Sequence, residues 1–208
     1  MRRWAVDELH RRWDGLSVTG SVHVGTARAD RFAAFGAGSL VCFPWTALYN
    51  EHAIRIGRDT IVGPLVSLSA GMVPGQELLH DAIVVIGDRC LIGRGSSIVG
   101  HICIEIGDDV YTGPNVYITD QNHGMDDLDV PIGRQWPAPE APVRIGAGSW
   151  LGTGAVVLPG VTIGRGVAVG AGSIVTDDLP DHAVAVGSPA RVVRMRTGQP
   201  NNGRTSSA

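Results

Sequence analysis

The feature that most constrains the fold of this chain is an aliphatic residue at every sixth position in its C-terminal half. The register holds for six consecutive hexads, at Ile145, Leu151, Val157, Ile163, Val169 and Val175. An amphipathic helix repeats near every 3.6 residues and a half-buried strand every 2, so neither explains a period of six. Glycine follows four of the six aliphatic residues. The pattern predicts a short strand followed by a corner, repeated along the chain.

The same hexads recur upstream in groups of three, which makes eighteen residues per group. These groups are Ile56, Val62 and Leu68; Ile86, Ile92 and Ile98; and Ile106, Thr112 and Ile118. Three strands per turn would stack the aliphatic side chains of successive coils in columns. A sandwich with unrelated glycine-rich turns is the alternative, but it would not hold one register for six hexads. The sequence therefore predicts an all-β chain folded as a parallel β-helix.

The register is interrupted at residues 74–85, 104–105 and 124–144. Insertions in a solenoid leave the stack as loops, and long ordered loops often carry function. We expect one domain in three parts: a short N-terminal cap over residues 1–34, the β-helix over 35–195 with 124–144 as its protruding loop, and a disordered tail over 196–208. The spacing of Trp4, Leu9, Trp13 and Leu16 favours a helix in the cap.

Composition agrees with many tight turns and small core residues, because the chain has 29 Gly and 12 Pro and is 44% hydrophobic but only 5% aromatic. A net charge of −3 gives no general reason to expect nucleic acid or an anionic membrane as a partner. The apolar runs are far shorter than the roughly 20 residues that span a bilayer. Charged residues occupy the N-terminus, where a signal peptide needs an apolar core, so we predict a cytoplasmic protein. Cys42, Cys90 and Cys103 suggest buried thiols rather than a disulfide or metal framework.

Three segments, residues 106–123, 143–152 and 169–194, resemble the hexapeptide-repeat acyltransferases. The resemblance is to the sugar O-acetyltransferase branch, which includes the galactoside, maltose, nodulation and colanic acid enzymes, and it covers about residues 35–195. It implies a left-handed β-helix, although parallel crossovers are usually right-handed. It also implies a homotrimer with active sites between subunits, acyl-coenzyme A (acyl-CoA) as co-substrate, and no metal.

The resemblance assigns catalysis to His123, which ends the segment Asp120-Gln121-Asn122-His123 at the start of the protruding loop. A neutral imidazole can remove the proton of a sugar hydroxyl as that hydroxyl attacks a thioester. A lone histidine is more often structural, but its position and its match to the family favour catalysis. Asn122 and Asp120 are candidates for orienting the base or the acceptor, with a solvated turn as the competing interpretation.

By match of positions, the resemblance assigns coenzyme A (CoA) binding to Thr153, Ala171 and Thr176 along the pantetheine arm and to Arg191 and Arg194 at the phosphates. An arginine fork suits phosphate, although a solvated surface charge is an equal alternative for each arginine. Asp177 stands where relatives commonly carry a basic residue, which puts one phosphate contact in doubt.

On the acceptor side, Trp150 retains the aromatic residue of the family near the cleft, and Trp136 lies in the loop. An aromatic face commonly packs on a sugar ring, but a structural role for Trp150 is as reasonable. Gly95 replaces a sugar-contacting asparagine of galactoside-type relatives, so small galactoside acceptors are not supported.

The sequence therefore predicts transfer of an acyl group, acetyl by default, to a hydroxyl of a sugar, oligosaccharide or polysaccharide. A succinyl or longer acyl donor and a non-catalytic trimeric scaffold are the alternatives. A γ-class carbonic anhydrase shares the β-helix but needs three zinc histidines, including a closely spaced pair. The histidines at 80, 101, 123 and 182 offer no such pair.

Overall fold

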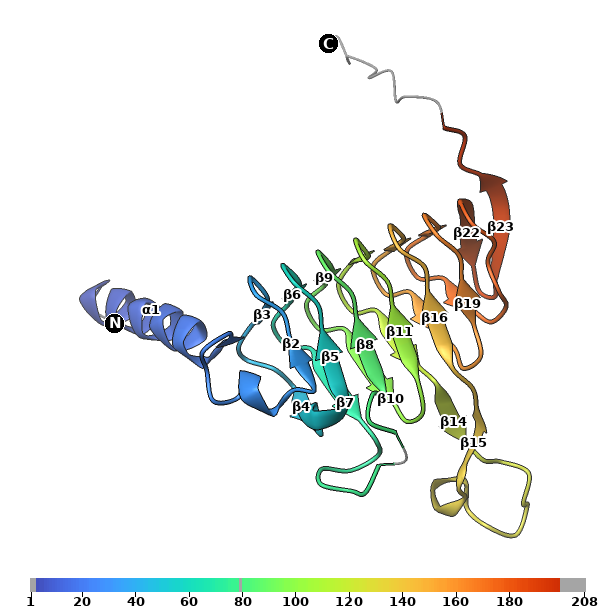
Figure 1. Cartoon of the computed structure of the whole chain (residues 1–208), viewed down its shortest axis with the longest axis horizontal. Helices are drawn as coiled ribbons and strands as arrows, with labels where there is room; N and C mark the ends of the chain where they lie inside the picture. The colour runs from blue at the N-terminus through green and yellow to red at the C-terminus, as the bar shows by residue number, and fades with distance from the viewer. Residues whose placement is uncertain (1–2, 79, 199–208) are drawn as a thin grey trace.

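The computed structural model describes residues 3–78 and 80–198. One long helix, α1 (Arg3–Gly20), is followed by three sheets wound into a prism (Figure 1). Three short 3-10 helices, at Ala29–Arg31, Glu51–Ala53 and Ile132–Arg134, lie in the connections.

Each coil contributes one strand to each face of the prism. Sheet A contains, in spatial order, β1 (Val22–His23), β3 (Leu40–Val41), β6 (Ile61–Val62), β9 (Leu91–Ile92), β12 (Tyr111–Thr112), β17 (Trp150–Leu151), β20 (Ala168–Val169), β22 (Ala183–Gly187) and β23 (Ala190–Met195). Sheet B contains β2 (Ala34–Phe35), β5 (Ile54–Ile56), β8 (Val84–Ile86), β11 (Ile104–Ile106), β16 (Val143–Ile145) and β19 (Thr162–Ile163). Sheet C contains β4 (Ala47–Tyr49), β7 (Ser67–Ala70), β10 (Ser97–Gly100), β13 (Tyr117–Thr119), β18 (Val156–Val157) and β21 (Ile174–Val175). Strands of successive coils pair in parallel, which is the parallel β-helix predicted from the hexads.

The core consists of the predicted aliphatic columns. In sheet B the paired residues Ile56, Ile86, Ile106, Ile145 and Ile163 are stacked from coil to coil, and each is at most 2% exposed. Their neighbours on the same strands face outward, because side chains alternate along a strand. A period of six therefore points the same hexad position into the prism on each of its faces.

The corners explain why glycine follows four of the six aliphatic residues in the C-terminal hexads. At Gly146 an added Cβ would lie 2.5 Å from the backbone of Gly164 in the next coil, so coils can stack this closely only with glycine there. A second corner position needs a left-handed backbone, as at Gly148 with φ of +70°. Glycine adopts that conformation at little cost.

The two ends of the stack differ from the predicted cap and tail. Helix α1 forms where the spacing predicted a helix, but it has no buried residue and extends away from the prism (Figure 1), with Trp4 65% and Leu9 63% exposed. At the C-terminus Arg196 is described: its Nη1 donates to the Gly166 carbonyl at 2.6 Å. Residues 199–208 of the predicted tail lie outside the described residues.

The third interruption forms a hairpin that projects from the prism (Figure 1). Its antiparallel strands are β14 (Gln121–His123) and β15 (Pro137–Glu140). The hairpin leaves the stack after β13 and returns at β16, so its root lies at the corner between sheets C and B.

Candidate active site

His123 is the last residue of β14 and lies at the root of the projecting hairpin. Its cross-strand partner is Pro137 of β15, and its backbone N–H donates to Asn122 Oδ1 at 2.9 Å. Its side chain is exposed. It lines a small cavity of about 110 Å³ with Met72, Tyr117, Thr119, Gln121, Asn122 and Pro137. The hairpin thus holds an accessible imidazole beside a hollow on the edge of sheet C.

Gln121 brings an amide into the same cavity. Its Oε1 is buried and has no hydrogen-bond partner among the residues that the structure describes. Buried polar atoms are usually paired, since leaving one unpaired costs about 1–3 kcal/mol. Sequence reasoning did not single out this residue, because a glutamine in a polar loop carries no signal of burial.

Asp120 is fully buried, so the interpretation of this residue as a solvated turn residue is wrong. Its Oδ1 accepts the backbone N–H of His101 at 2.7 Å, and its Oδ2 accepts those of Ile102 and Cys103 at 2.8 and 2.7 Å. These three donors form the corner between β10 and β11, one coil earlier. The carboxylate therefore pairs three N–H groups of a buried to half-buried corner that have no other hydrogen-bond partner among the described residues.

Glu140, the last residue of β15, contacts the same corner from the other strand of the hairpin. Its Oε1 is paired with Nδ1 of His101, and the His101 side chain is only 8% exposed. Glu140 also pairs with Gln121 across the hairpin. Neither Glu140 nor His101 was singled out from the sequence, because 39 residues and the whole insertion separate them.

The structure places the predicted CoA residues along two corners. Thr153 follows β17, and Ala171 follows β20 at the same corner one coil later, where the Gly172 N–H donates to the Thr153 carbonyl at 2.8 Å. Thr176 follows β21 at the next corner. All three are exposed, and sheet C separates Thr176 from the other two.

The two predicted phosphate arginines lie on one face of the β22–β23 hairpin. Arg191 pairs with Val186 and Arg194 with Val184, while Ala183 and Ala185 point into the core. Residues three apart on a regular strand face opposite sides. A bulge between these two pairs shifts the alternation by one residue, so both arginines face outward.

Arg191 is not a free cation in this arrangement. Its Nη1 donates to Asp177 Oδ2 at 2.8 Å, and the same oxygen accepts the hydroxyl of Thr176 at 2.8 Å. Both charged side chains are about two-thirds exposed, at 63% and 66%. The guanidinium that was predicted to bind phosphate is therefore already paired with Asp177.

The two tryptophans occupy different faces. Trp136 is 74% exposed and immediately precedes Pro137, the cross-strand partner of His123. Trp150 lies on the outer face of sheet A, paired with Tyr111 and 50% exposed. A single chain therefore brings Trp136, but not Trp150, close to the hairpin root.

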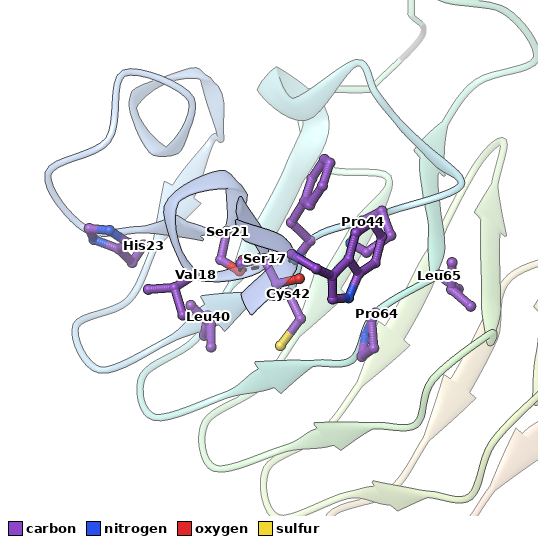
Figure 2. A pocket seen from close by; sticks show the side chains of 11 residues that line it. Ser17, Val18, Ser21, His23, Leu40, Cys42, Pro44, Pro64 and Leu65 are labelled. Carbon is purple, nitrogen blue, oxygen red and sulfur yellow. Dashed lines mark hydrogen bonds between the residues drawn. The ribbon is translucent and has the colours of Figure 1, made fainter. Parts of the chain in front are cut away.

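A larger cavity, of about 610 Å³, lies between α1 and the first coils, at the N-terminal end of the stack (Figure 2). Its lining is mostly apolar and includes Trp13, Leu40 and Leu65. Cys42 also lines it, and burial raises the pKa of that thiol above its ordinary value. This cavity could not be predicted from the sequence, because it depends on the direction in which α1 leaves the stack.

Two further properties bear on the chemistry. Within residues 3–78 and 80–198, no three His, Cys, Asp or Glu side chains gather closely enough to hold a metal ion. In the same part of the chain, no helix is long and apolar enough to cross a bilayer.

Two family models match the repeats. Residues 142–177 match the bacterial transferase hexapeptide model of six repeats, and residues 83–120 match the hexapeptide repeat of succinyl-transferase. The two matches fall on either side of the projecting hairpin. They cover the coils from which the hairpin leaves and to which it returns.

Curated relatives are acetyltransferases. A probable acetyltransferase of Mycobacterium tuberculosis is 42% identical over 143 residues, which are 69% of this chain and 44% of that relative. Galactoside O-acetyltransferase of Escherichia coli is 34% identical over 148 residues, which are 71% of this chain and 66% of the relative. The chain thus spans less than half of the mycobacterial protein and about two-thirds of the galactoside enzyme.

Solved structures share the fold. A maltose O-acetyltransferase from Clostridium difficile superposes with a TM-score of 0.51 at 28% identity, covering 80% of this chain and 71% of that one. An N-acyltransferase from Bacillus cereus, solved with dTDP and CoA, gives a TM-score of 0.71 over 86% of this chain and 91% of its own, but at 20% identity it supports the fold alone. The repeats and these structures fit a left-handed β-helix. From the repeat models and the O-acetyltransferase relatives together, the chain belongs to the hexapeptide-repeat acetyltransferases, in the sugar O-acetyltransferase branch.

Proposed function

We propose that the protein transfers an acyl group, acetyl by default, from acyl-CoA to a hydroxyl of a sugar, oligosaccharide or polysaccharide. The observation that carries this proposal is the accessible imidazole of His123, held beside a small cavity at the root of the hairpin. The relatives named as galactoside and maltose O-acetyltransferases support a hydroxyl acceptor.

In the proposed reaction His123 acts as general base. Its neutral imidazole removes the proton of the acceptor hydroxyl while the oxygen attacks the thioester carbonyl. The tetrahedral intermediate then expels the CoA thiolate, and the imidazolium passes the hydroxyl proton to that thiolate, so that ester and free thiol are the products. A positioned base of this kind contributes roughly 10²- to 10⁴-fold in rate.

The donor would lie along the coils that follow the hairpin, with its pantetheine arm past Thr153, Ala171 and Thr176. Arg194 would bind the phosphates of CoA. Arg191 would do so as well once its ion pair with Asp177 is broken. Because sheet C separates these corners within one chain, we propose that the cleft is completed by a neighbouring subunit of a homotrimer. That neighbour would also bring an aromatic residue such as Trp150 to the acceptor, facing Asn122 and Trp136.

The test is a panel of acetyl-, succinyl- and longer-chain acyl-CoA thioesters, assayed by release of free thiol against oligosaccharides and amino sugars. We expect acceptor-dependent thiol release with neutral oligosaccharides and acetyl-CoA. Release only with amino sugars would contradict hydroxyl transfer. Failure to bind any acyl-CoA would favour the trimeric scaffold instead.

A further inference from the structure

We propose that Asp120, His101 and Glu140 form a clamp at the hairpin root that positions His123 for catalysis. This inference rests on the proposed function. The three residues, called the hairpin clamp below, do not touch the reacting atoms. They act through the strand that carries the base.

The first half of the clamp precedes β14. Asp120 is fully buried, and its carboxylate accepts three consecutive backbone N–H groups, those of residues 101–103. Hydrogen bonds to an ionised acceptor are about twice as strong as neutral ones. Since His123 lies only three residues further along, this anchor fixes where its strand leaves the prism.

The second half of the clamp ends β15. Glu140 pairs with His101, the same residue whose N–H is bound by Asp120, so both strands are tied to one corner. Two backbone hydrogen bonds close the root: Ala141 N–H to the Asp120 carbonyl at 2.9 Å, and Val143 N–H to the Cys103 carbonyl at 3.0 Å.

The outer part of the hairpin cannot supply the same constraint. Its apolar side chains are exposed: Met125 by 55%, Leu128 by 95% and Ile132 by 54%. Few buried contacts mean low local stability. The direction of the hairpin, and with it the position of the imidazole, is therefore set at the root.

The clamp is tested by Glu140→Ala and Glu140→Gln in the full-length protein. A misplacement of about 1 Å can cost 10²-fold in rate, so we expect Glu140→Ala to lower kcat by roughly 10- to 100-fold while KM for acetyl-CoA changes little. Glu140→Gln keeps an oxygen that can pair with His101 and should recover most of that loss. Should Glu140→Ala not fold, His101→Ala removes the other partner and is measured in its place.

Glu105→Ala is the matched control. Glu105 pairs with Arg144 at 3.0 Å, also across 39 residues and also in the coils that flank the hairpin, but both side chains are about half exposed. Loss of that surface pair should leave kcat at the parent value.

A double variant separates positioning from simple stabilisation. If the clamp acts through His123, adding Glu140→Ala to His123→Ala causes no further loss of turnover, whereas the decrease in melting temperature persists. A folded Glu140→Ala protein with parental kcat and only a lower melting temperature would overturn the clamp while leaving the proposed function intact. Parental turnover in His123→Ala would instead remove the proposed base, and the clamp with it.

Discussion

A substitution in the aliphatic column that contains Ile163 is the most direct test of the core. Its side chain is 1% exposed and is stacked on Ile145 of the preceding coil. Replacing a buried isoleucine with alanine removes transfer free energy and leaves a cavity, at a cost of about 2–5 kcal/mol. Because neighbouring coils hold the column rigidly, we expect little collapse around the cavity.

The expected shift in melting temperature follows from the size of the chain. For a domain of 150–250 residues, about 1 kcal/mol corresponds to roughly 2–4 °C. Ile163→Ala should therefore melt roughly 4–20 °C below the parent. The measurement is circular dichroism or calorimetry at one fixed protein concentration, since assembly would make the melting temperature concentration-dependent.

Thr162→Ala is the control on the same strand. Thr162 faces outward, and surface substitutions usually change stability by less than about 0.5 kcal/mol. Ile163→Asp should yield no folded protein, because an unpaired buried charge costs several kcal/mol out of a total of about 5–15 kcal/mol. If Ile163→Ala melted like the parent while Thr162→Ala was strongly destabilised, the two faces of the strand would be wrongly assigned.

Three further predictions concern the donor residues and the thiols. Asp177→Asn frees Arg191 from an exposed ion pair worth up to about 1 kcal/mol, so KM for acetyl-CoA should fall by up to about fivefold; a rise in KM would contradict this. Arg194→Ala should raise KM for acetyl-CoA with nearly unchanged kcat, because a remote phosphate is held equally in ground and transition states. The dephospho-CoA thioester, which lacks the 3′-phosphate, should show no such effect. Burial raises the pKa of the Cys90 thiol, so mass spectrometry should find Cys90 unmodified by iodoacetamide at neutral pH until the protein is unfolded.

The sequence was most informative where burial follows a strict period. The register of six predicted which aliphatic residues stack, since in a coil of three strands it determines which side chains point inward. The break after Asn122 and His123 likewise located the root of the projecting hairpin. These are local properties of the chain, and they are visible without knowing which segments meet in space.

Contacts between segments far apart in the sequence were not predictable. For Asp120 the sequence left two interpretations open, a residue that orients the base or the acceptor and a solvated turn residue. Its actual partners are backbone N–H groups 17 to 19 residues earlier. The pairing of His101 with Glu140 depends on how the hairpin returns to the stack. The pairing of Arg191 with Asp177 depends on how β23 folds back along β22. The spacing of Trp4, Leu9 and Trp13 predicted a helix but not its direction.

The measurement that tests the central claim most directly is acyl transfer by His123→Ala, assayed by thiol release together with binding of acetyl-CoA. If His123 is the general base, the variant should fold and bind acetyl-CoA like the parent, but its turnover should fall by roughly 10²- to 10⁴-fold. Near-parental turnover with the same acceptor would contradict the account.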